Sequence, residues 1–336
     1  MAGRPRLVDV AARAGVSEKT VSNFVNGYPH ISASTREKVE AAISELGYRP
    51  NLSARSMGRG RTGFIAFAVP GLDNPYFAEL AGRVISRAAE ERWTVLIEET
   101  GGRKTSEDAL VDTMPYLVDG IILHPESLTA VDIAERGRDT PIVLIGERDL
   151  ARSADHVVSD NVAAAREITQ HLLDSGRRSI ATIGLRPDAS LQTSQLRHWG
   201  FSAALERMGL VADEDLSVAA EGYARADGDL AMQQILASGK LPDAVLCFNA
   251  VVAAGALSRL AREGISVPGR VAVAAFDDID EAAFMVPPLT TVAWDVGAIA
   301  DSAVRLLAER QEARTAPVRE VSVGYRLEIR ASTTGL

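Results

Sequence analysis

The sequence predicts an α/β protein in two parts, a small N-terminal all-α module followed by a two-lobed body with parallel sheets. Three observations predict this arrangement. Apolar residues recur at helical spacing through the first fifty residues, short apolar runs alternate with helical stretches from Phe64 onward, and the two parts carry opposite net charge. The chain of 336 residues also exceeds what one ordinary core supports.

The first two predicted helices are joined by a short turn. One apolar helical face predicts the first helix and consists of Leu7, Val10, Ala11 and Ala14. Gly15 ends this helix, and Ser17 caps a second one over residues 17–26. Two short helices joined by a glycine turn form a helix-turn-helix, whose second helix enters the major groove of DNA. A third helix is predicted from near Ser32 to Gly47.

Charge separates the module from the body. Residues 1–62 hold ten Lys/Arg against five Asp/Glu, so their net charge is +5, while the rest of the chain is −14 within a total of −9. A basic end on an acidic body is expected when only that end contacts DNA. A basic tail without function and a generic three-helix bundle are the plainer alternatives. The short, polar exposed face of helix 17–26 favours DNA binding over both.

The body is predicted from alternating segments. Strand-like runs occupy 64–69, 94–99, 120–125, 141–146, 179–184, 244–249 and 271–276. Helical stretches occupy 76–92, 105–118, 161–175, 195–208, 226–238 and 250–263. Such alternation is typical of parallel sheets covered on both faces, and about 270 residues suit two similar lobes. A ligand is therefore expected between the lobes, at the carboxyl ends of the strands.

Several classes of protein do not fit the sequence. The single cysteine, Cys247, excludes an internal disulfide, and five scattered histidines lack metal-ligand spacing, so no metal or cofactor is expected. No P-loop, G-x-S-x-G or H-E-x-x-H motif occurs, so no enzyme is expected. Neither a signal peptide nor a membrane-spanning run is found, which predicts a cytoplasmic protein without a membrane partner.

The first sixty residues resemble a known family. DVAARAGVSEKTVSNFVNG, TREKVEAAISELGYRPN and ARSM, between about Leu7 and Met57, are similar to the N-terminus of lactose-repressor/galactose-repressor (LacI/GalR) regulators. The resemblance implies a helix-turn-helix domain at 1–49 and a hinge helix and linker at 50–62. It also implies a homodimeric repressor that binds a near-palindromic operator in double-stranded DNA and responds to a small-molecule effector.

The resemblance further implies which residues contact DNA. Glu18, Lys19 and Asn23 occupy base-reading positions, where their chemistry suits a cytosine amino group, guanine acceptors and adenine, respectively. Members often carry arginine at the position of Asn23, so the operator is expected to differ from better-known ones. Met57 replaces the leucine that wedges into the minor groove, a role that methionine also fills. The predicted DNA-binding residues are Ser17, Glu18, Lys19, Thr20, Ser22, Asn23, Asn26, Tyr48, Asn51, Ala54, Arg55 and Met57.

The resemblance continues more loosely over 63–336. It implies a periplasmic-binding-protein-like body, with lobe 1 at about 63–160 and 293–330 and lobe 2 at about 161–292. Arg, Asn and Asp side chains supply donors and acceptors for hydroxyl groups, and aromatic rings pack on sugar faces, so the expected effector is a sugar or sugar derivative. Ala250 and Ala275 depart from the family pattern. The predicted ligand-binding residues are Asp73, Tyr76, Phe77, Asp160, Thr193, Arg197, Tyr223, Asn249, Asp277 and Trp294.

Other functions stay open at this point. A nucleobase- or nucleoside-responsive regulator is the main rival, because Trp294 stands where many relatives have a polar residue. An extracytoplasmic sugar-binding protein would share the body but lack the helix-turn-helix. A sugar-processing enzyme would need a catalytic pair of carboxylates, and the pair Asp277 and Asp278 already has a place in the family pattern.

Overall fold

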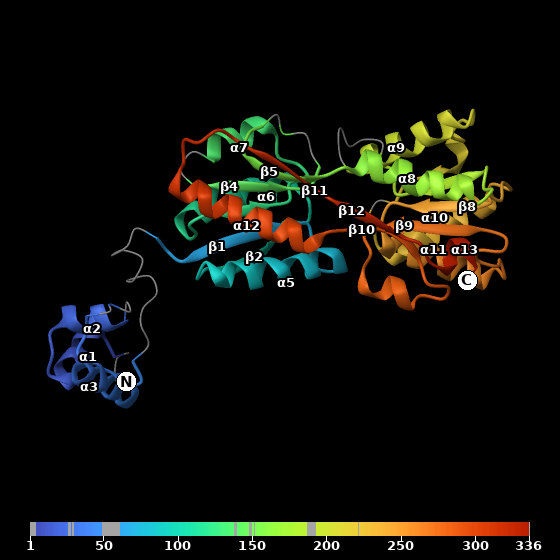
Figure 1. Cartoon of the computed structure of the whole chain (residues 1–336). Coiled ribbons are helices and arrows are strands. Elements are labelled where there is room, and N and C mark those ends of the chain that lie inside the picture. The colour runs from blue at the N-terminus through green and yellow to red at the C-terminus, as the bar shows by residue number, and fades with distance from the viewer. Residues whose placement is uncertain are drawn as a thin grey trace. The chain divides into compact units, whose positions relative to one another are not determined.

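The computed structural model describes residues 5–25, 28, 30–48, 61–137, 140–147, 150, 152–186, 193–220 and 222–335 (Figure 1). The chain divides into two compact units, Met1–Gly63 and Phe64–Leu336. Among the described residues, no helix has both the length and the apolar character needed to cross a membrane.

The described residues of the N-terminal unit form three helices: α1 (Leu7–Ala14), α2 (Glu18–Val25) and α3 (Ala33–Leu46). α1 and α3 end at glycines with positive φ, 65° for Gly15 and 61° for Gly47, a left-handed conformation that favours glycine. The apolar sides of the helices meet in a core of Val10, Ala11, Val21, Val39, Ala42 and Tyr48. The predicted helix-turn-helix is confirmed.

Two six-stranded sheets form the body. The first has the order β11-β5-β4-β3-β1-β2 and contains β1 (Phe64–Val69), β2 (Thr94–Glu99), β3 (Ile121–Leu123), β4 (Ile142–Ile145), β5 (Asp155–Ser159) and β11 (Glu320–Val323). The second has the order β12-β10-β9-β8-β6-β7 and contains β6 (Ile180–Ile183), β7 (Ser217–Val218), β8 (Ala244–Cys247), β9 (Ala272–Phe276), β10 (Thr290–Trp294) and β12 (Tyr325–Glu328). All these pairings are parallel except that of β10 with β12, as the α/β prediction requires.

Helices cover both faces of each sheet, which explains why the strands read as continuous apolar runs. In β1, Ile65 and Phe67 face α5 (Pro75–Glu90) and α12 (Val296–Glu312), while Ala66 and Ala68 face α6 (Lys104–Thr113) and α7 (Ala130–Arg136). In the second sheet, one face packs on α8 (Asn161–Asp174) and α9 (Thr193–Arg207). The other face packs on α10 (Arg225–Ala237) and α11 (Ala250–Arg262).

The chain passes between the sheets three times, and the last passage corrects a prediction. It goes from β5 to α8, returns from β10 to α12, and crosses again between β11 and β12 at Gly324. The prediction assigned 293–330 to lobe 1, but β12 pairs with β10 in the second sheet, and α13 (Ala331–Thr334) contacts β9 and β10. The physical reason is that the exposed edge of β10 needs a backbone partner, which the returning strand supplies.

Candidate functional site

α2 presents a polar side to solvent. Val21 is buried and anchors the helix to the small core, while Glu18 and Lys19 are exposed and Asn23 is half-buried. Ser17 Oγ accepts a hydrogen bond from the backbone N–H of Thr20 at 3.1 Å, which satisfies a donor at the start of the helix. The residues expected to read bases are therefore carried on the side of α2 away from its core.

Other residues predicted to bind DNA are more buried or already make contacts within the N-terminal unit. Tyr48 is buried in the three-helix core with 8% of its surface exposed, so packing accounts for its ring. Ser22 is half-buried on α2, and the hydroxyls of Ser17 and Thr20 lie 2.8 Å apart. The remaining predicted residues lie outside the described residues; they are Asn26, Asn51, Ala54, Arg55 and Met57.

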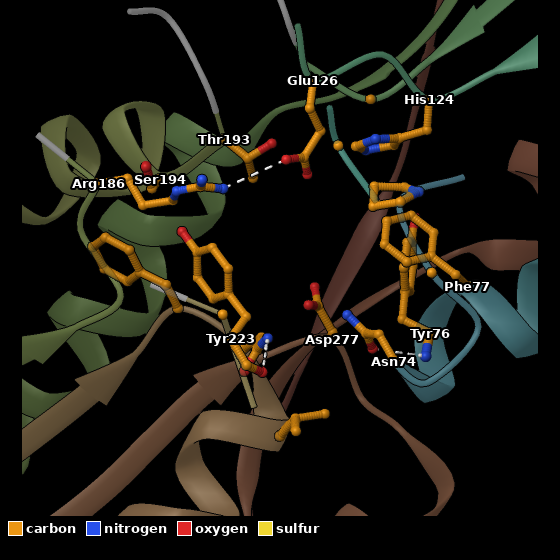
Figure 2. Close-up of a pocket in the computed structure, with 18 of the residues that line it drawn as sticks. Asn74, Tyr76, Phe77, His124, Glu126, Arg186, Thr193, Ser194, Tyr223 and Asp277 are labelled. Carbon is orange, nitrogen blue, oxygen red and sulfur yellow. Dashed lines mark hydrogen bonds and ion pairs between the residues drawn. The ribbon is translucent and has the colours of Figure 1, made fainter. Parts of the chain in front are cut away.

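A cavity of about 500 Å³ lies in the body where strands of both sheets end (Figure 2). Its walls come from the residues that follow the carboxyl ends of β1, β2, β3 and β4 in the first sheet and of β6, β7, β8 and β9 in the second. This is the position expected for ligands in parallel α/β folds. Nine of the predicted ligand-binding residues line it: Asp73, Tyr76, Phe77, Thr193, Arg197, Tyr223, Asn249, Asp277 and Trp294.

Arg197, on α9, lines the cavity and connects several of the residues around it. Its Nε donates to Asn161 Oδ1 at 2.7 Å, its Nη1 donates to the carbonyl oxygen of Phe248, and its Nη2 lies 3.1 Å from Asp277 Oδ1. The guanidinium also lies 4.2 Å from the ring centroid of Phe276, a cation–π contact. Both members of the Arg197–Asp277 ion pair are buried, so neither charge is left uncompensated.

Backbone geometry places two further side chains. Tyr223 and Asp277 both adopt positive φ, 54° and 67°, a conformation uncommon for residues other than glycine. Tyr223 Oη donates to the carbonyl of Gly184 at 2.7 Å, which holds its ring on the cavity wall. Asn249 Oδ1 accepts from the backbone N–H of Val252 at 2.7 Å and so caps α11, while its Nδ2 donates to the carbonyl oxygen of Tyr223 at 3.4 Å.

Asp160 does not line the cavity, which corrects its predicted role. Its Oδ1 accepts from the backbone N–H of Ala163 at 2.8 Å, so the carboxylate caps α8. Asp160 follows β5 just as some cavity residues follow β3 and β4. Its carboxylate instead binds a backbone N–H group at the N-terminus of α8.

Among the polar residues of the cavity wall that the sequence did not identify are four that come soon after strands: His124, Glu126, Glu147 and Arg186. Each follows a strand of a parallel sheet, and that position was the available signal. Two pairs join the walls contributed by the two sheets. Arg186 Nη1 lies 3.4 Å from Glu126 Oε2 (Figure 2), and Thr193 Oγ1 donates to Glu147 Oε2 at 3.1 Å.

Burial shifts the protonation equilibria of the cavity. Desolvation lowers the pKa of His124 to about 4, so its imidazole is neutral at pH 7. Desolvation also raises the pKa of Glu147 above its ordinary value, against the opposing effect of the Arg197 charge. The pKa of Tyr76 is raised by desolvation and by the negative charges of Glu147 and Asp277. No group of residues that could hold a metal ion occurs among those that the structure describes.

Comparisons with known proteins identify the family. A model of bacterial regulatory proteins of the lacI family matches residues 6–51, and a model of the periplasmic binding protein-like domain matches residues 169–333. The HTH-type transcriptional repressor CytR of Escherichia coli (strain K12) is 31% identical over 332 residues, which cover 98% of this chain and 96% of CytR. The chain belongs to the LacI family.

Solved structures agree with the LacI-family assignment. The lac repressor dimer bound to operator and the anti-inducer ONPF has a TM-score of 0.85 and 25% identity, covering 98% of this chain and 99% of that one. The complex of the transcriptional regulator CelR with cellobiose has a TM-score of 0.72 and 30% identity, with 98% and 100% covered. The predicted family and fold are confirmed. This LacI-family chain is a helix-turn-helix transcription regulator with a small-molecule-binding body, and its relatives have a non-enzymatic role.

Proposed function

We propose that this LacI-family regulator is a cytoplasmic, homodimeric repressor that binds a near-palindromic operator and is controlled by a sugar or sugar derivative. One observation carries the proposal. The chain that presents the polar face of α2 also contains a cavity of about 500 Å³ lined by Arg197, Asn249 and Asp277. A cavity of this size suits a small polar ligand.

DNA recognition is assigned to the polar face of α2 and to the linker. Lys19 donates to guanine acceptors, Asn23 pairs with adenine, and Glu18 accepts from a cytosine amino group. In the linker we assign the minor-groove wedge to Met57, with phosphate contact by Arg55. Replacing Met57 by alanine then weakens specific binding and reduces DNA bending, while replacing it by leucine preserves both.

Exposed apolar side chains on the body support a homodimer. Tyr116, Leu117, Phe284 and Val286 expose 86%, 53%, 83% and 91% of their surfaces, far more than large apolar side chains usually do. A second copy would cover such surfaces, and two copies would read the two halves of a palindrome. Among the similar structures, the lac repressor was solved as a dimer bound to operator.

The choice of a sugar follows from the chemistry of the cavity wall. The amide of Asn249 and the carboxylates of Asp277 and Glu147 offer donors and acceptors for hydroxyl groups, and the Tyr223 ring offers an apolar face. CelR, to which this chain is similar, was solved with cellobiose. A nucleobase-type ligand is the second candidate, because the rings of Tyr223 and Phe77 stand on opposite walls of the cavity (Figure 2).

Control requires that the effector favour one of two states of the body. Operator DNA and effector then bias a single equilibrium, and each changes the affinity of the other by the same factor. A thermal-shift screen of the full chain against mono- and disaccharides, nucleosides and nucleobases tests the effector class, since a ligand of the folded state raises Tm. Stabilisation by sugars supports the proposal, and stabilisation by nucleosides or nucleobases alone contradicts its sugar component.

A further inference from the structure

The arginines that line the cavity are already paired. Three nitrogens of Arg197 donate to Asn161, Phe248 and Asp277, and the side chain is buried. Arg186 lies 3.4 Å from Glu126, and its guanidinium lies 5.9 Å from the ring centroid of Tyr223.

Arg225, the remaining arginine of the wall, lies at its exposed rim. Its Nη2 is 3.9 Å from Glu281 Oε1, and both side chains are 55% exposed. An anionic ligand would therefore compete with Asp277 for Arg197 and with Glu126 for Arg186.

Glu147, unlike these arginines, has no ion-pair partner among the described residues. Its carboxylate lines the cavity and accepts from the Thr193 hydroxyl at 3.1 Å and from the backbone N–H of Ser159. Desolvation raises the pKa of this carboxyl, against the opposing charge of Arg197. On the same wall, His124 Nδ1 is buried without a hydrogen-bond partner in the described part of the chain. The Glu147 carboxylate can therefore accept further hydrogen bonds from donor groups of a ligand.

We infer that the effector is uncharged or carries a single basic nitrogen, that its donor groups bind Glu147, and that phosphorylated and carboxylated metabolites are rejected. Rejection follows from repulsion between a phosphate and the Glu147 carboxylate, since the carboxylates of Asp277 and Glu126 already pair with Arg197 and Arg186. Hydroxyl or amino donors satisfy the same carboxylate without a new charge, and a basic nitrogen would compensate it.

The inference rests on the proposed function, namely that the cavity holds the effector. The test therefore uses small molecules extracted from the cells that produce the protein, separated by ion exchange into anionic, neutral and cationic fractions. Each fraction is added to the full chain and Tm is measured. Matched probes run beside them: glucose, glucosamine and glucose 6-phosphate, and adenosine with its 5′-monophosphate.

Stabilisation by the neutral or cationic fraction, and by no phosphorylated probe, supports the inference. Stabilisation by the anionic fraction overturns it but leaves the proposed effector control intact. No shift with any fraction contradicts the proposed function and the inference with it.

A variant without the Glu147 charge tests whether this carboxylate contacts the effector. Glu147→Gln keeps the shape of the side chain, so the active neutral or cationic fraction is expected to bind at least about tenfold more weakly, while anionic probes gain affinity. Glu135→Gln, at an exposed position of α7, is the matched control and leaves both affinities unchanged. If Glu147→Gln binds the active fraction as tightly as the unaltered chain, the carboxylate does not contact the effector.

Discussion

Trp294 donates its indole N–H to Asp277 Oδ1 at 2.8 Å, the same oxygen that lies 3.1 Å from Arg197 Nη2. Trp294 is the last residue of β10, and the chain then crosses from the second sheet to α12. A ligand that contacts the Asp277 carboxylate therefore acts on a group bonded directly to a segment that joins the two lobes. We propose this link as a physical route from effector binding to the arrangement of the body.

Replacing Arg197 tests the cavity floor. Arg197→Ala leaves the buried Asp277 charge without its cation, so we expect the free energy of unfolding to fall by about 3–5 kcal/mol. Arg197→Lys retains a charge but cannot make the three directed bonds, so it should lose the effector response with a smaller loss of stability. Chemical denaturation and effector titration measure the two effects.

Operator binding should survive Arg197→Lys, because the DNA-reading helix belongs to the other unit of the chain. The variant would contradict the proposed site if it released or engaged DNA with unchanged effector sensitivity.

Replacing the exposed polar residues of α2 tests whether this helix reads bases. Lys19→Ala and Asn23→Ala should each cost about 1–3 kcal/mol of operator affinity, and the loss should be confined to one base position per half-site. Binding to a set of operators with single base changes measures the effect by fluorescence anisotropy. Lys38→Ala on the exposed side of α3 is the matched control and should not change base preference. A uniform loss over all operators would show that Lys19 and Asn23 contact only phosphates.

The pair of Arg186 and Glu126 joins the two walls of the cavity, and its side chains are 33% and 28% exposed. Arg186→Gln and Glu126→Gln should each speed effector dissociation, and the double variant should be no faster than either single variant. The coupling free energy should be about 0.5–1 kcal/mol, as for partly exposed pairs. Stopped-flow measurement of dissociation gives the cycle, and additive effects of the two changes would mean that the pair is not coupled.

The buried His124 predicts a pH dependence of stability. Its pKa is about 4 in the folded chain, against an ordinary value of 6.5, so between these values the unfolded chain binds more protons. The free energy of unfolding should therefore rise as pH increases from 4 to 6.5, with a contribution from His124 of about 1–3 kcal/mol, and level off above. His124→Asn should flatten this part of the profile, as measured by chemical denaturation at a series of pH values. An unchanged profile for His124→Asn would rule out this source.

Helix ends and buried strands could be predicted from the sequence, because each is marked by residues within the element itself. Gly15 and Gly47 mark helix ends through their positive φ, and the apolar runs mark strands buried on both faces. The sequence could not assign β12, because only the open edge of β10 decides which sheet the residues Tyr325–Glu328 join. Composition alone does not reveal such an edge.

The site was predicted where a residue type and its place in the family pattern agree, as for Arg197 and Asp277. Glu147 and His124 were missed because a polar residue after a strand becomes a cavity residue only when the opposite lobe faces it. Asp160 was misplaced for the converse reason, since its carboxylate is used by the N-terminus of α8.

We propose that this protein reads an operator with α2 and changes its affinity for that operator when a small molecule occupies the body cavity. The most direct measurement is a titration of the operator selected by the full chain, followed by fluorescence anisotropy, with and without the small-molecule fraction that raises Tm. We predict sequence-specific binding whose affinity changes by about 5–150-fold with that fraction in the unaltered chain, and no change in Arg197→Lys. Specific binding that is equally insensitive to the fraction in both proteins, or the absence of any selected sequence, would contradict the account.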